Sequence, residues 1–150
     1  MILRSLNIVK DRAGVAALEF ALVAPILIML AVGIAKFGLV LNNYVMLTEA
    51  VADGARIFAL ERGDPDADPY SDARSQVQST ASNLTTASLN ITLSVNGTPC
   101  SSDSQCNTFL STAQGQPATV AATYPCDLVV FGVDFAPGCT LSSSTTEMVE

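Results

Sequence analysis

The sequence predicts an α+β protein with one long N-terminal helix, first membrane-spanning and then amphipathic, followed by a small head of a few antiparallel strands with two disulfides. Three observations lead to this prediction. An almost unbroken apolar run covers residues 15–41, an amphipathic pattern continues it to residue 62, and short alternating segments with four cysteines follow. In a chain of 150 residues this leaves room for one modest domain outside the apolar run.

The apolar run follows a short basic leader, residues 1–14. Its 27 residues would form a helix about 40 Å long, which is enough to cross a hydrocarbon core about 30 Å thick. Glu19 and Lys36 are its only charged residues, and Lys36 lies near the outer end, where its side chain can reach the membrane surface. We expect a kink at Pro25, because proline has no N–H to bond the Ala21 carbonyl.

The charges are unevenly distributed along the chain. The net charge of −7 is made up of +2 over residues 1–41 and −9 over residues 42–150. Basic residues ahead of the apolar run predict a cytoplasmic N-terminus and a head on the opposite side of the membrane. The acidic head argues against nucleic acid as a partner, because phosphates would be repelled.

The helix is predicted to continue beyond the membrane. Leu47, Val51, Gly54/Ala55 and Phe58 recur at intervals of three or four, while charged residues occupy the other faces. A stop is predicted at Gly63. The predicted divisions are therefore a cytoplasmic leader, a transmembrane helix, an amphipathic extension and an extracytoplasmic head, at residues 1–14, 15–41, 42–62 and 63–150.

Short elements are predicted within the head, separated by turn residues. In chain order they are a helix over 73–84 capped by Ser71 or Asp72, a strand over 89–95 ending at the turn Asn96-Gly97, strand candidates over 119–124 and 128–133, and an edge strand over 140–149. A few antiparallel strands packed against the helix would make the head α+β.

All four cysteines, Cys100, Cys106, Cys126 and Cys139, lie in the predicted extracytoplasmic part. An even number of cysteines in an oxidising compartment favours two disulfides, and three pairings are possible. We favour Cys100–Cys106 with Cys126–Cys139, because each bond closes a short loop rich in turn residues. Zinc is disfavoured, since the spacings are wrong and the chain has no histidine.

The residue types argue against catalysis and against a metal site. Without histidine, a Ser–His or Cys–His nucleophile pair is impossible, and no serine lies in a G-x-S-x-G pattern. Asp64, Asp66 and Asp68 alternate as at the start of an EF-hand loop, but Pro69 and Ser75 stand where that loop needs glycine and glutamate. We predict a non-enzyme with no catalytic, cofactor-binding or metal-binding residues, and a solvated acidic linker at these aspartates.

The segment Arg12–Pro25, with the sequence RAGVAALEFALVAP, closely resembles the start of TadE/TadF-like proteins, the pseudopilins of Tad (Flp) pilus machines. The resemblance continues in Ala52–Arg56, and it returns in Ala118–Pro125 and more loosely in Thr145–Glu150. It implies a pilin-like helix and a structural role in assembling the Flp type IV pilus, and so in adhesion. The cysteines are not part of what the resemblance carries over.

The resemblance also implies processing by a prepilin peptidase after Gly14, which would make Val15 the mature N-terminus. Glu19 would be the fifth mature residue, able to neutralise the Val15 ammonium of its own or the next subunit, with Phe20 packing beside it. The implied partners are the prepilin peptidase, Flp pilin and other pseudopilins, the inner-membrane Tad platform and the lipid bilayer. The implied location is the bacterial inner membrane, with the head in the periplasm.

An alternative interpretation is a general secretory signal with an apolar core from about Phe20. A cut after Ala35 would then release a soluble binding domain. Against this alternative stand Glu19 at the start of the core and the helical pattern that continues past the cut.

Overall fold

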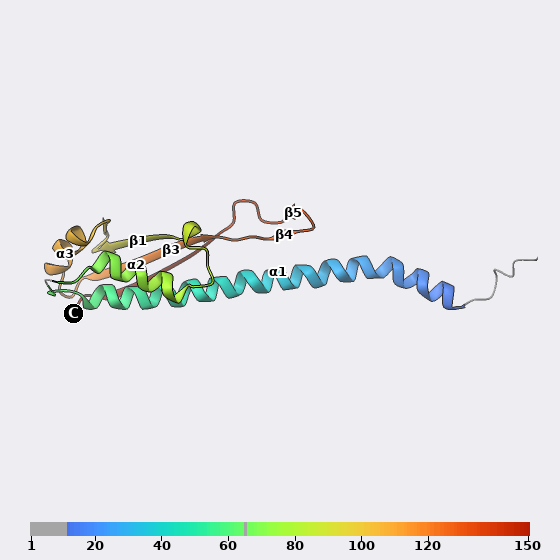
Figure 1. Ribbon diagram of the computed structural model, residues 1–150, viewed down its shortest axis with the longest axis horizontal. Coiled ribbons are helices and arrows are strands. Elements are labelled where there is room, and N and C mark those ends of the chain that lie inside the picture. Colours follow the sequence, from blue (N-terminus) through green and yellow to red (C-terminus); the bar gives the residue numbers. More distant parts are fainter. Residues whose placement is uncertain (1–11, 65) are drawn as a thin grey trace, which may run out of the picture.

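The computed structural model describes residues 12–64 and 66–150, and it shows a head carried on the C-terminal half of one very long helix (Figure 1). In chain order, the elements are α1 (Arg12–Leu60), α2 (Pro69–Thr80), a short 3-10 turn η1 (Thr86–Ser88), β1 (Asn90–Val95), β2 (Thr98–Cys100), α3 (Asp103–Ser111), β3 (Pro117–Pro125), β4 (Val129–Val130), β5 (Val133–Asp134) and β6 (Thr140–Met148).

Helix α1 confirms the predicted continuous helix and its two different halves. It runs through Pro25 without interruption, and Figure 1 shows it bending in its blue, N-terminal part. The predicted apolar stripe of the second half is fully buried, since Leu47, Val51, Ala55 and Phe58 are each 0% exposed. The helix ends just before Gly63, whose φ of 83° suits glycine.

The head is a four-stranded antiparallel sheet packed against α1 and α2. Its strand order is β2-β1-β3-β6, so β6 forms an edge as predicted, and β3 lies between β1 and β6 with Val120 opposite both Leu93 and Thr145. Alternate residues of β1 and β3 face the helices. The core joins the stripe of α1 to Ala73 and Val77 of α2 and to a set of strand residues, Ile91, Leu93, Val95, Ala118, Val120 and Ala122.

Three predicted elements differ from the structure. Helix α2 begins at Pro69 rather than residue 73, with Asp68 as the N-cap, because proline fits the first helical position, where its missing N–H costs nothing. Residues 128–133 are not one strand: β4 and β5 form a separate two-stranded hairpin that turns at Phe131-Gly132. Helix α3 occupies a stretch for which the sequence predicts only a disulfide-closed loop.

Candidate processing and assembly surface

The residues that the sequence singles out for processing and assembly lie together in the first turns of α1, at the end farthest from the head (Figure 1). Val15 and Phe20 are exposed to 61% and 69%, and Gly14 and Glu19 are exposed as well. Val15 and Glu19 are four residues apart, so they share one face of the helix. The structure thus places Val15 and Glu19 on one face, while Gly14 and Phe20 lie on other faces of the same exposed turns.

Gly14 has open space around it. A Cβ built there would meet no atom within 4 Å, so packing within the chain does not require glycine at this position. Glycine inside a helix costs roughly 0.5–1 kcal/mol relative to alanine. Its presence therefore weakens the helix locally, at the bond where cleavage is predicted.

The first half of α1 is apolar on all sides. Within the described part of the chain, one helix is long and apolar enough to cross a membrane, with a mean hydropathy of 2.5 over its most apolar stretch, none of which is buried. This fits a single-pass membrane protein. Most of the basic leader, residues 1–11, lies outside the described residues.

The second half of α1 carries the Gly-Ala-Arg segment, Gly54 to Arg56, and packs against α2. A Cβ at Gly54 would collide with Cγ2 of Val77 and lie 3.2 Å from the Ala73 carbonyl oxygen. Gly54 therefore lets the two helix backbones approach closely, while Ala55 enters the core beside it. Arg56 is exposed and lines a shallow pocket with Glu147 and Glu150.

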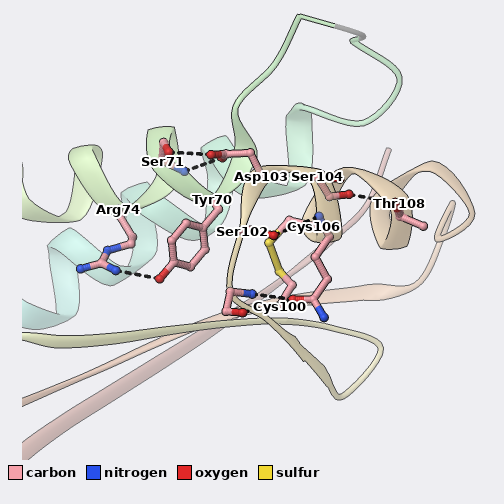
Figure 2. Close-up of a disulfide and its surroundings, with 11 residues drawn as sticks. Tyr70, Ser71, Arg74, Cys100, Ser102, Asp103, Ser104, Cys106 and Thr108 are labelled. Atoms are coloured by element: carbon pink, nitrogen blue, oxygen red, sulfur yellow. Dashed lines mark hydrogen bonds between the residues drawn. A yellow bond between two sulfur atoms is a disulfide. The ribbon is translucent and has the colours of Figure 1, made fainter.

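The N-terminal turns of α2 and α3 meet at the end of the head farthest from the apolar half of α1 (Figure 2). Asp103 accepts hydrogen bonds from the Ser71 backbone N–H at 2.8 Å and from the Ser71 hydroxyl at 2.7 Å. Desolvation disfavours the charged carboxylate, but the bonds from Ser71 outweigh it and lower the pKa of Asp103. The pair fixes α3 against α2.

Glu61 lies next to these residues, just after the end of α1. Burial, together with the nearby carboxylates of Asp72, Asp103 and Asp64, raises its pKa from 4.5 to about 7. A carboxyl group that shares its site with like charges is more easily protonated, so this end of the head responds to pH near neutrality.

Both favoured cysteine pairs lie at disulfide distance in the structure. Cys100 and Cys106, whose Cα atoms are 5.3 Å apart, join β2 to α3 and are buried in the core. Cys126 and Cys139, with Cα atoms 5.4 Å apart, close the base of the β4–β5 hairpin. The first bond therefore belongs to the head, and the second to an appendage of it.

The aspartates of the linker take part in an ordinary turn in the structure. Asp64 accepts a hydrogen bond from the Asp66 backbone N–H at 3.0 Å, as in an ordinary turn. Among residues 12–64 and 66–150, no group of three or more acidic, cysteine or histidine side chains is arranged to hold a metal ion.

Sequence reasoning missed the Ser71–Asp103 link and helix α3 that presents it. A signal was available, since Ser102 followed by Gln105 is the S-x-x-Q pattern of a helix start, and the Ser102 hydroxyl accepts from the Gln105 backbone N–H at 3.4 Å. It also missed the apolar face of the β4–β5 hairpin. Alternation alone cannot show that a two-residue turn divides an apolar run.

Comparison with known proteins finds a family match within helix α1. No curated protein and no solved structure matches the chain. The family model described as TadE-like protein matches residues 14–56, from the glycine at the predicted cut to the arginine of the Gly-Ala-Arg segment. The resemblance to the TadE-like family is thereby confirmed over residues 14–56 of α1.

Proposed function

We propose that the protein is a TadE-like pseudopilin, or minor pilin, which acts structurally in assembly of the Tad/Flp type IV pilus. The observation that carries this proposal is that the family match begins at Gly14, just before the exposed, predominantly apolar half of α1. In this proposal a prepilin peptidase cuts after Gly14. The mature chain then begins at Val15 and keeps the entire helix that carries the head.

Glu19 supports the proposal through its energetic cost. A carboxylate within an inserted helix costs about 2.5–3.5 kcal/mol at the bilayer centre and less toward the surface. Here it lies one turn from Val15, whose ammonium, once freed by cleavage, would offset its charge. Phe20 provides an exposed aromatic contact beside it.

The proposed location is the bacterial inner membrane, with residues 1–14 in the cytoplasm, 15–41 in the bilayer, and 42–62 together with the head, 63–150, in the periplasm. The proposed partners are the prepilin peptidase, Flp pilin and other pseudopilins, and the inner-membrane Tad platform. Through the pilus the protein would contribute to adhesion.

The alternative of a soluble domain released near Ala35 has less support. Helix α1 continues through Ala35 without a break, and Lys36 forms an ion pair with Asp127 of the head at 3.5 Å. The β4–β5 hairpin and α1 residues on both sides of Ala35, from Ile26 to Phe37, line the two walls of one groove. A cut there would remove most of the α1 wall of this groove.

The test is the N-terminal sequence and intact mass of the protein recovered from native membranes. We expect a start at Val15 in the wild type and uncut precursor in Gly14→Leu. The matched control is Gly33→Leu, the same change at another open position of α1, which should be cut normally. A start near Lys36, or Met1 retained in the wild type, would refute the processing step.

A second test separates cleavage from assembly. Glu19→Ala and Glu19→Gln should both be cut after Gly14 but should both reduce the amount of pilus on the cell, because neither carries a charge to pair with the Val15 ammonium. Full pilus output from Glu19→Ala would contradict the proposed charge role while leaving the processing proposal intact.

A further inference from the structure

The β4–β5 hairpin between Cys126 and Cys139 leaves the head and runs back along α1 toward its N-terminal half (Figure 1). Three large apolar side chains are exposed on it, Phe131 at 68%, Val133 at 57% and Phe135 at 58%, together with Asp134, whose carboxylate accepts from the Ala136 N–H. A hairpin that faces water normally carries polar residues at such positions. This apolar face needs an apolar environment.

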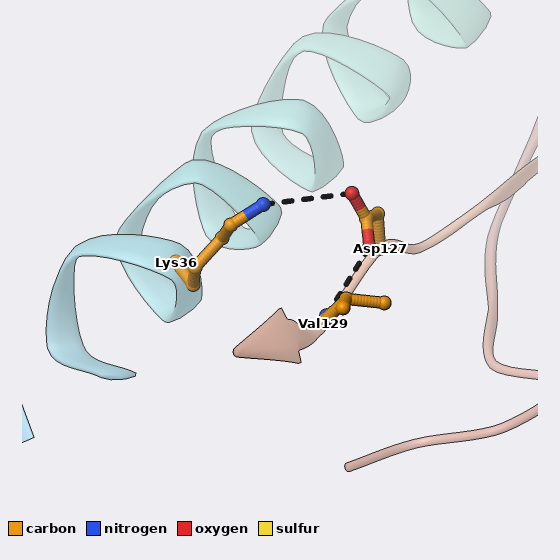
Figure 3. A network of polar contacts seen from close by, with 3 residues as sticks. All are labelled: Lys36, Asp127 and Val129. Carbon is orange, nitrogen blue, oxygen red and sulfur yellow. Dashed lines mark hydrogen bonds and ion pairs between the residues drawn. The ribbon is translucent and has the colours of Figure 1, made fainter. Parts of the chain in front are cut away.

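The position of the hairpin along α1 identifies that environment. Its residues contact a groove whose other wall is α1 from Ile26 to Phe37, entirely within the apolar run. Any element packed against this part of α1 lies at bilayer depth when α1 spans the membrane. The ion pair of Lys36 with Asp127, at 3.5 Å, lies at the base of the hairpin (Figure 3) and suits the membrane surface.

The dimensions agree with that placement. Ten residues of α1 separate Lys36 from Ile26, which corresponds to about 15 Å, or half of a core about 30 Å thick. The hairpin would thus reach no deeper than one leaflet. A bilayer hydrocarbon core that begins at Lys36 would end near Ala16. Gly14 would then lie at the cytoplasmic face, where a peptidase can reach it.

The turn of the hairpin provides an independent observation. Phe131 and Gly132 both have positive φ, 50° and 80°, the pattern of a type I′ turn. The β1–β2 hairpin makes the same turn with Asn96 and Gly97, at 50° and 77°, where asparagine is the residue type that such a turn favours. A bulky aromatic residue is strained in this conformation, and strain of this kind is retained where it serves a function.

Part of the hairpin backbone has its polar groups satisfied within the protein. Irregular backbone is tolerated at membrane depth only where its polar groups are satisfied within the protein. Pro137 has no N–H, and five other hairpin N–H groups have internal acceptors. These bonds are Cys126 to the Cys139 carbonyl, Phe135 to the Leu128 carbonyl, Cys139 to the Ala136 carbonyl, Val129 to the Asp127 carboxylate and Ala136 to the Asp134 carboxylate.

A groove of about 510 Å³ remains between the hairpin and α1. Apolar side chains line it from both sides, among them Ile26, Leu30 and Phe37 of α1 and Leu128, Val130 and Phe135 of the hairpin. We propose that the hairpin inserts into the outer leaflet beside α1, with Phe131 leading, and that phospholipid acyl chains fill this groove. The inference depends on the proposed membrane anchoring of α1.

The absence of tryptophan from the chain allows a direct test. Three single-tryptophan variants of the full chain, Phe131→Trp, Leu22→Trp and Asn96→Trp, are reconstituted in vesicles of phosphatidylethanolamine and phosphatidylglycerol. Leu22 lies in the exposed apolar half of α1, and Asn96 holds the same turn position as Phe131 in the other hairpin. Quenching is measured with nitroxide-labelled acyl chains and with aqueous acrylamide.

We expect the tryptophans at positions 131 and 22 to be quenched by the labelled lipid and protected from acrylamide, and the tryptophan at 96 to behave oppositely. Acrylamide quenching at 131 with lipid quenching at 22 would overturn the insertion but leave the anchoring intact. Protection at 131 from both quenchers would mean that protein, such as a second copy of α1, covers the hairpin. This result would also overturn the insertion. Loss of lipid quenching at 22 would overturn the anchoring and the insertion together.

A further variant checks the role of the apex. Phe131→Asn keeps the turn geometry, since asparagine is the residue type at the equivalent turn position, but removes the apolar contact. With Val133→Trp as the reporter, this change should convert lipid quenching into acrylamide quenching. Unchanged lipid quenching at 133 would refute the role of Phe131.

Discussion

The contact between α1 and α2 at Gly54 allows a quantitative prediction for Gly54→Ala. The new methyl group would collide with Cγ2 of Val77 and lie 3.2 Å from the Ala73 carbonyl oxygen. Valine has little rotamer freedom within a helix, and a backbone oxygen moves only if α2 shifts. Overpacking of this kind costs about 1–3 kcal/mol, and these rigid neighbours place it in the upper part of that range. Alanine restores about 0.8–1 kcal/mol of helix propensity.

The net loss is therefore about 1–2 kcal/mol of unfolding free energy, which corresponds to a decrease in Tm of roughly 5–15 °C for a head of this size. The assay is thermal unfolding of the full chain in detergent, followed by near-ultraviolet circular dichroism of the tyrosines, two of which, Tyr70 and Tyr124, pack against the core. Gly38→Ala is the matched control. It lies in the same helix with no atom within 4 Å of the new methyl, so its Tm should be unchanged or slightly higher. A Gly54→Ala protein as stable as the wild type would refute the close-approach argument.

Three further changes test the head and the hairpin. The pKa of Glu61 is about 7 in the folded head and 4.5 as an ordinary carboxyl, so between these pH values the folded state binds more protons than the unfolded state. The unfolding free energy should therefore fall as the pH rises from 4.5 to above 7. After allowance for solvent screening, we expect a decrease of about 1 kcal/mol. In urea titrations at pH 5 and pH 8, Glu61→Gln should remove this difference, and a slope that persists would assign it to other groups. Replacing Cys100 and Cys106 together by serine should lower unfolding free energy by at least about 2 kcal/mol, since it opens a six-residue loop in the core. Replacing Cys126 and Cys139 together should leave the Tm of the head nearly unchanged but increase proteolysis of the hairpin, and an equal loss in both double variants would show that the hairpin is part of the head's cooperative unit.

The sequence was most informative where one physical pattern dominated. The stripe Leu47, Val51, Ala55 and Phe58 predicted the face of α1 that the head covers, because a helix must bury one contiguous side. Strict alternation predicted β1, and the pair Asn96-Gly97 predicted its turn. Short loop closure was enough to favour the cysteine pairing that the structure contains.

Sequence reasoning was less successful where two signals competed or where contacts are distant. Residues 128–133 are apolar throughout and look like one strand, yet Phe131-Gly132 adopts a turn whose usual asparagine is missing. Helix α3 has few apolar residues, so its periodicity was weak and only its cap marked it. The bond between Ser71 and Asp103 joins residues 32 positions apart, which no local pattern reveals.

The division of α1 into two halves bears on how the proposed assembly would proceed. Buried positions in α1 begin at Val40, so the head leaves the first half to be covered by something else. If that half moves from the bilayer into a fibre, its apolar side chains exchange lipid for other helices, an exchange with little hydrophobic driving force because acyl chains are as apolar as leucine. Glu19 is different, since a carboxylate gains substantially when an ammonium replaces lipid beside it. The apolar residues therefore contribute little to the free energy of transfer, and the proposed pairing of Glu19 with the Val15 ammonium would favour the fibre over the bilayer.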